Sequence, residues 1–166
     1  MEETLKIINK MQADGILGKY AIGGAIGASF YLEPTSSLDI DIFASFKEMG
    51  SSLDPLRPIY DYLLPLGARP ENEHLWIKGW LVQFLPAEGG LCEEALSEAV
   101  QTTVRAVPTW VMSAEHLMAL ALKLGRHKDL ARVERFIEIG SYDQSKLDDI
   151  LRRHNLIDKW KAISDK

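Results

Sequence analysis

Two aspartates alternate along a short apolar segment that follows a glycine pair near the amino terminus. Residues 20–43 read YAIGGAIGASFYLEPTSSLDIDIF. If residues 38–43 form a β-strand, side chains two positions apart share a face, so Asp39 and Asp41 stand side by side with their backbones roughly 6 to 7 Å apart. Two ionised carboxylates this close repel each other, and a divalent cation between them relieves the repulsion unless one pKa rises instead. The segment is therefore a candidate Mg²⁺ site.

The glycine pair occupies the place of a dinucleotide-binding turn, between a predicted strand at residues 20–22 and a predicted helix at residues 25–32. That turn requires the spacing G-x-G-x-x-G and a crossover of about 30 residues. Here the glycines are Gly23, Gly24 and Gly27, and the intervening helix is too short. The pattern therefore disfavours a nicotinamide or flavin enzyme.

The composition favours one globular domain. A chain of 166 residues, 46% of them hydrophobic, can bury a substantial core. No charge-free apolar run approaches the length of a membrane span, and the opening residues MEETLKIINK do not resemble a signal sequence, so we expect a cytoplasmic protein with no membrane association. A net charge of −5 argues against broad DNA binding, which depends on many Lys and Arg contacts to phosphates.

Hydrophobic periodicity predicts an α/β core followed by a helical cap. Leu5, Ile8 and Met11 have helical spacing, and Asp14 with Gly15 ends this first helix. Further strands are expected at residues 38–43, 74–78, 80–85 and 102–107, the last ended by a proline. Further helices are expected from residue 54 to 67, at 93–99, from 113 to 125, from 130 to 140, and around 147–151 and 157–163. We expect the core to comprise residues 1–110 and the helical subdomain residues 111–166.

The order of a glycine pair, a short helix and a D-x-D strand resembles the signature of the nucleotidyltransferase superfamily of the DNA polymerase β type. The chain is most similar to the small nucleotidyltransferases of type IV toxin-antitoxin systems. Three further segments carry this resemblance: WLVQFLP at residues 80–86, EEALSEAV at 93–100 and SAEHLMALALKLGRHKDLARVERFIE at 113–138. It implies an α+β fold of α/β-like character, with a mixed β-sheet flanked by helices and a C-terminal helical cap.

The resemblance also assigns roles near the glycine pair. Asp39 and Asp41 would hold Mg²⁺ or Mn²⁺, which bridges the triphosphate of a bound nucleoside triphosphate. Gly23 and Gly24 would leave room for the phosphates, near the backbone N–H groups at the start of the following helix. The hydroxyl groups that precede the aspartates either contact the nucleotide or simply form the turn, and they belong to Thr35, Ser36 and Ser37.

A basic cluster in the helical segment supplies candidates for the remaining roles. By resemblance, Lys123 and Arg126 would meet the triphosphate, with Lys128 nearby, and Asp129 would orient one of them or assist the metal. The alternative is a solvated helix face on which Asp129 caps the second cap helix and pairs with Arg126 or Arg132. The four histidines show no zinc spacing, so we expect core or surface positions for them.

Gln83 stands where the superfamily carries a third carboxylate. A neutral amide cannot act as a general base and is a poor Mg²⁺ ligand, although it can hydrogen-bond a base or a sugar. Either another acid such as Asp129, Glu71 or Glu88 acts instead, or the protein binds nucleotide without turnover.

The sequence thus leaves three readings. The first is a nucleotidyltransferase acting on a hydroxyl of a protein, an RNA or a small molecule. The second is a catalytically weak or inactive antitoxin or binding module, with a toxin or antitoxin as its partner. The third is an interaction scaffold on which the aspartate pair is a surface feature.

Overall fold

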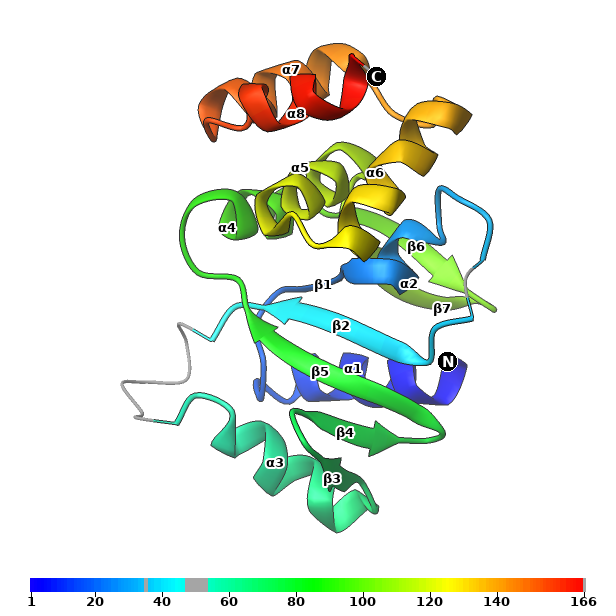
Figure 1. The fold of residues 1–166 in the computed structure, drawn as a ribbon. Helices are drawn as coiled ribbons and strands as arrows, with labels where there is room; N and C mark the ends of the chain where they lie inside the picture. Colours follow the sequence, from blue (N-terminus) through cyan, green and yellow to red (C-terminus); the bar gives the residue numbers. More distant parts are fainter. Residues whose placement is uncertain (35, 47–53, 166) are drawn as a thin grey trace.

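A seven-stranded mixed β-sheet forms the centre of the molecule (Figure 1). The computed structural model describes residues 1–34, 36–46 and 54–165. The strands are β1 Tyr20–Ile22, β2 Asp39–Ala44, β3 Arg69–Glu71, β4 His74–Ile77, β5 Trp80–Pro86, β6 Val100–Val104 and β7 Val107–Val111. Their order in the sheet is β3-β4-β5-β2-β1-β7-β6. The pairs β2/β5 and β1/β7 are parallel and the other neighbours antiparallel.

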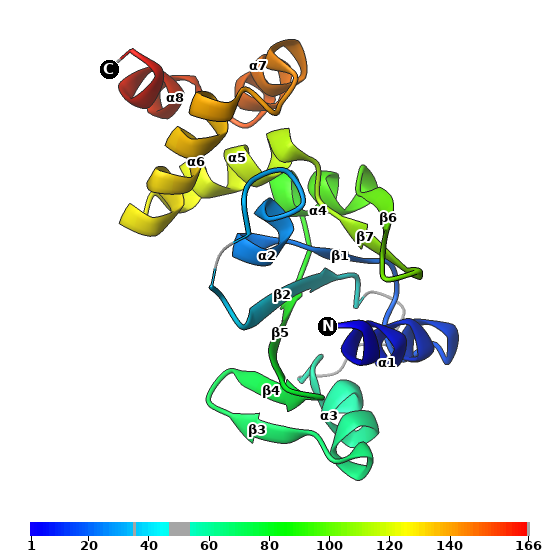
Figure 2. The same ribbon diagram turned by 90° about the vertical axis from the view of Figure 1, so that its right-hand side faces the viewer.

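Helices cover both faces of this sheet, and the α+β class expected from the sequence is confirmed. They are α1 Glu2–Ala13, α2 Gly24–Ala28, α3 Arg57–Leu63, α4 Gly90–Ser97, α5 Ala114–Leu124, α6 His127–Ile139, α7 Gln144–Arg153 and α8 Ile157–Ser164, with a 3-10 turn at Leu64–Leu66. In both views α5 to α8 gather at one end of the molecule and α3 lies with β3 and β4 at the other (Figures 1 and 2). Across the described ranges, none of the helices combines the length and apolar character that a bilayer span requires.

Two hydrophobic clusters lie against the sheet. One joins α1 and α3 to the strand residues that alternate inward, such as Ile40 and Ile42. The other joins α4 to α8 with Ala21 of β1 and Met112, which directly follows β7. The stripe predicted for the opening helix is confirmed, since Leu5 and Ile8 are fully buried in the first cluster. The sheet is thus anchored from both sides, and β1 and β2 run through its middle.

The alternation predicted for the DID strand is present in β2. Ile40 and Ile42 are buried, whereas Asp39 is exposed and Asp41 half-buried on the opposite face. On the parallel neighbour β5, the register pairs Gln83 with Asp41. Because paired residues of neighbouring strands point to the same face, the amide of Gln83 stands beside the Asp41 carboxylate.

Residues 102–107 form no single strand, so that expectation was wrong. The segment turns at Arg105 and Ala106, whose φ values are 47° and 69°, and β6 and β7 pair as a tight antiparallel hairpin. A two-residue hairpin turn needs this left-handed backbone, which glycine and asparagine usually supply. Pro108 lies within β7, and its carbonyl accepts a hydrogen bond from Asn9 Nδ2 at 2.7 Å.

The start of α5 and the ends of α5 and α6 lie where their terminal residues predict, whereas α6 begins at His127, three residues before the expected start. The Ser113 hydroxyl accepts a hydrogen bond from the backbone N–H of His116 and so caps α5. Gly125 and Gly140 have φ values of 67° and 71° at the carboxyl ends of α5 and α6. The three-residue strand β3 was not expected, because RPE carries no apolar alternation, and α2 ends four residues earlier than expected, at Ala28.

Candidate nucleotide and metal site

The glycine pair packs directly against the aspartate strand. The backbone N–H of Gly23 donates to the carbonyl of Asp41 at 2.9 Å, and Gly24 has a φ of +58°. A Cβ atom at Gly24 would lie 1.9 Å from Asp41 Oδ2, and one at Gly23 would lie 2.5 Å from a ring carbon of Phe43. Both positions therefore require glycine in order to seat the turn against β2. Their predicted contact with phosphates stays a prediction.

Asp41 carries negative charge in a place that disfavours it. Burial raises the pKa of its carboxyl and the Asp39 charge raises it further, while the nearby positive groups of His74, Arg132 and Lys128 oppose the rise. A raised pKa means that the ionised form is incompletely compensated. The exposed Asp39 shares this face of β2. Two carboxylates in this setting fit a divalent cation, which binds oxygen ligands and removes the repulsion.

Positive side chains on the first turns of α6 act on Asp41 of β2, namely Lys128 and Arg132. Asp129 is buried and accepts hydrogen bonds from Arg126 Nε at 2.5 Å and from Arg132 Nη1 at 3.4 Å. Asp129 makes no capping hydrogen bond to α6, whose first flanking residue is Arg126. The hydrogen bond to Asp129, aided by the charge of Asp41, raises the pKa of Arg126. Asp129 therefore holds two guanidinium groups near the carboxylate pair.

Two other candidate side chains, those of Lys128 and Ser37, lie near the aspartates. Lys128 lies near enough to Asp41 to affect its pKa, and Ser37 Oγ accepts from the Asp39 N–H at 3.3 Å. Ser36 is exposed, and Thr35 lies outside the described residues.

The exposed Lys123 lies elsewhere in the fold. Its carbonyl accepts from Lys159 at 3.1 Å, and its charge acts on the Cys92 thiol. The structure thus groups Lys123 with α4 and α8 rather than with the charges around Asp41, and its catalytic role stays a prediction.

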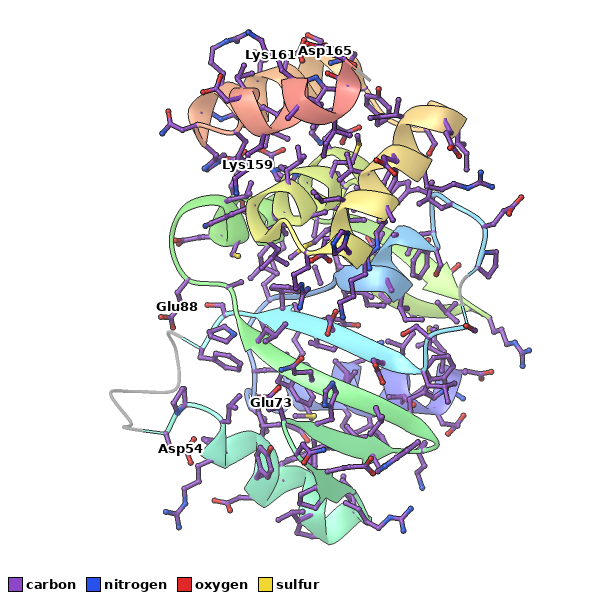
Figure 3. The ribbon with its side chains drawn as sticks, viewed as in Figure 1. Asp54, Glu73, Glu88, Lys159, Lys161 and Asp165 are labelled. Atoms are coloured by element: carbon purple, nitrogen blue, oxygen red, sulfur yellow. The ribbon has the colours of Figure 1, made fainter. Side chains whose placement is uncertain are left out.

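None of the three acids considered as substitutes for Gln83 is a free partner of Asp41. Asp129 is occupied by its arginines. Glu71 accepts a hydrogen bond from Trp76 Nε1. Glu88 is exposed, and Figure 3 shows it on the outside of the loop between β5 and α4, directed away from the sheet.

Sequence reasoning missed two residues near the site, His74 and Arg132. His74 is the first residue of β4, which lies two strands away from β2 in the sheet, and it pairs with Glu71 of β3. Arg132 was considered only as a surface partner of Asp129, and the structure confirms that pairing. Both charges act on Asp41 from elements distant in sequence. The polar alternation of β4 was the one available signal for His74.

Comparisons with solved structures identify the fold. The solution structure of the antibiotic-resistance factor ANT(2'')-Ia aligns with a TM-score of 0.54 and 15% identity over 99% of this chain and 97% of that one. The crystal structure of ANT(2'')-Ia in complex with adenylyl-2''-tobramycin gives a TM-score of 0.54 and 14% identity over 94% and 98%. An antigenic nucleotidyltransferase-like protein from Paracoccidioides brasiliensis gives 0.52 and 13% over 98% and 88%.

The chain therefore has the nucleotidyltransferase fold, and the fold expected from the glycine pair and the D-x-D strand is confirmed. No protein-family model matches the sequence. No curated protein matches it either.

Proposed function

We propose that this protein binds a nucleoside triphosphate with Mg²⁺ or Mn²⁺ at Asp39 and Asp41 and transfers its nucleotidyl group to a hydroxyl acceptor. The observation that carries the proposal is the contact between Gly24 and the Asp41 carboxylate, on a fold shared with nucleotidyltransferases. The turn and the metal-binding carboxylates then form one unit, and the arginines held by Asp129 supply the opposite charge.

Each side chain has a physical task in this proposal. Asp39 and Asp41 hold the metal, which neutralises the charge that develops as pyrophosphate leaves. Arg126 and Arg132 meet the negative phosphates, since a planar guanidinium suits phosphate oxygens. Gln83 orients the sugar or the acceptor by hydrogen bonding but takes no proton.

A second candidate function follows from Gln83 itself. Because the residue that the register sets beside Asp41 is an amide, nucleotide binding without turnover is the alternative. The resemblance to type IV systems makes an antitoxin-like binding module, a partner toxin or antitoxin and a cytoplasmic location parts of this alternative. The ANT(2'')-Ia complex holds an adenylylated small molecule, which is a precedent for a small-molecule acceptor in the first candidate.

Incubation with each labelled triphosphate and Mg²⁺ or Mn²⁺ tests the proposal. The Asp39→Asn, Asp41→Asn double variant keeps the side-chain shape and removes both charges. Pyrophosphate release or label transfer that this variant loses supports the enzyme. Metal-dependent binding without release supports the binding module. The absence of binding to every triphosphate contradicts both candidate functions.

Gln83→Glu tests the amide directly, because it adds a carboxylate of nearly the same shape beside Asp41. The enzyme proposal expects this variant to release pyrophosphate faster than the wild type. Gln101→Glu is the matched control, since it adds the same charge at an exposed position on β6. An equal rise in both variants contradicts a specific role for residue 83.

A further inference from the structure

A row of polar side chains crosses three neighbouring strands of the sheet. The strands β2, β5 and β4 lie side by side (Figure 1). The parallel register of β2 and β5 pairs Asp41 with Gln83. The antiparallel register of β5 and β4 pairs Val82 with Leu75, so the next residue of β5, Gln83, lies opposite the preceding residue of β4, His74. The row therefore runs from Asp41 through Gln83 to His74.

All three side chains of this row lie on one face of the sheet. Their strand neighbours Ile40, Val82 and Leu75 are buried in the cluster formed with α1 and α3. Since side chains alternate along each strand, the row points to the other face, away from these two helices. His74 is half-buried there, and within the described part of the chain its ring makes no hydrogen bond. Its ring nitrogens are therefore free to contact a bound molecule.

The spacing of the row suits the transfer of a proton beside the carboxylate pair. Neighbouring strands lie about 4.8 Å apart, so the backbones of Asp41 and His74 are about 10 Å apart, and the charge of His74 acts on Asp41. Opposed residues of an antiparallel pair have Cβ atoms about 4.5–5.5 Å apart. A hydroxyl group that hydrogen-bonds to the Gln83 amide is therefore within reach of the His74 ring, either directly or through one water.

We propose that His74 is the general base that deprotonates the acceptor hydroxyl, a task that the amide of Gln83 cannot perform. This inference rests on the proposed nucleotidyl transfer. A ring nitrogen of His74 takes the proton, and the oxygen uses the freed electron pair to attack the α-phosphorus of the triphosphate. The new O–P bond forms as the bond from the α-phosphorus to the bridging oxygen breaks. Pyrophosphate leaves with that electron pair, next to Arg126 and Arg132.

Carboxylates on both sides of His74 favour the positive charge that its ring gains with the proton. Glu71 lies opposite His74 on β3, and its carboxylate accepts a hydrogen bond from Trp76 Nε1. On the other side the charge of His74 interacts with Asp41, beyond Gln83. A base with an acidic group behind it is a recurring arrangement at sites of nucleophilic attack. The row thus places a proton acceptor, with its charge compensated, beside the position of the acceptor hydroxyl.

Label transfer by the full chain tests the base, with α-labelled triphosphates, Mn²⁺ and the protein, RNA and small molecules of a cell extract as acceptors. His74→Gln should slow transfer by about 10²- to 10⁴-fold and leave the Mn²⁺-dependent triphosphate affinity unchanged. Adding Gln83→Glu to His74→Gln should recover about tenfold or more, because the new carboxylate can take the proton. His154→Gln is the matched control, since His154 is also half-buried but contacts Glu94 in the cap, and it should transfer label at the wild-type rate.

Mn²⁺ alone gives a readout that does not depend on activity. The paramagnetic ion broadens the NMR signals of the nearest nuclei most strongly, and His74→Gln identifies the ring signals of His74 by their loss. In the wild type these signals should broaden at lower Mn²⁺ concentrations than those of His154. The Asp39→Asn, Asp41→Asn variant should lose this difference.

The outcomes separate a failure of the base from a failure of the proposed function. Label transfer that His74→Gln retains in full overturns the role of His74 and leaves nucleotidyl transfer standing. A loss of triphosphate affinity in His74→Gln as large as its loss of transfer contradicts a general base, as does equal Mn²⁺ broadening of His74 and His154. Triphosphate binding without transfer by the wild type overturns both the base and the enzyme, and leaves the binding module.

Discussion

Replacing Gly24 by alanine should separate the function of the glycine turn from its backbone strain. A left-handed alanine costs about 1–2 kcal/mol of folding stability. In a chain of this size each kcal/mol lowers Tm by about 2–4 °C. The new Cβ would also lie 1.9 Å from Asp41 Oδ2, whereas ordinary contact begins at 3.4 Å, so the carboxylate must move by about 1.5 Å. A metal site tolerates errors of only about 0.2 Å in its ligand distances.

Gly15 offers a matched control for this variant. Its φ is +74°, and nothing lies within 4 Å of a Cβ atom built there, so Gly15→Ala has the same backbone penalty without a clash. We expect Gly15→Ala to lose stability alone. Gly24→Ala should also lose about 10- to 100-fold in Mn²⁺-dependent affinity for a fluorescent triphosphate, measured by titration. Unchanged affinity in a folded Gly24→Ala protein would refute the reasoning.

Two further predictions concern stability. Burial, with the Glu115 charge, raises the pKa of Tyr31 from 10.0 to about 12. The neutral Tyr31 therefore contributes fully to folding stability below pH 10, and this contribution is lost as pH rises through about 12. Tyr31→Phe loses the hydrogen bond to Met112, and its stability deficit in urea should shrink between pH 10 and 12; a deficit constant with pH contradicts the assignment. Asp129→Asn should lower the free energy of unfolding in urea by about 1–3 kcal/mol, because two arginines lose a buried partner. The exposed Asp149→Asn should lower it by less than about 1 kcal/mol. Equal losses in the two variants would argue against the buried pair.

The elements predictable from sequence were those with strong local signals. The opening helix and the DID strand each show a clean period, and Ser113 caps α5 as its type predicts. The hairpin between β6 and β7 was not predicted, because Arg105 and Ala106 are not residue types that indicate a left-handed turn. In such a turn the strand pairing forces a backbone that the local sequence disfavours.

The residues of the candidate site also fall into two groups, those predictable from the local sequence and those that only the fold brings together. The aspartates and glycines lie within one short segment, so their spacing alone defined them. His74 and Arg132 reach Asp41 from other elements, and only the folded sheet and α6 bring them there. The contact between Glu94 and His116 was not predictable for the same reason, because the two residues lie 22 positions apart and no short motif joins them.

The alternation in β2 and β5 has a consequence for directed evolution. Ile40, Ile42 and Val82 point into the core, while Asp41 and its neighbour Gln83 point away from it. A combinatorial library can therefore vary Gln83 while Ile40, Ile42 and Val82 keep the core packed and Asp39 and Asp41 keep the carboxylate pair.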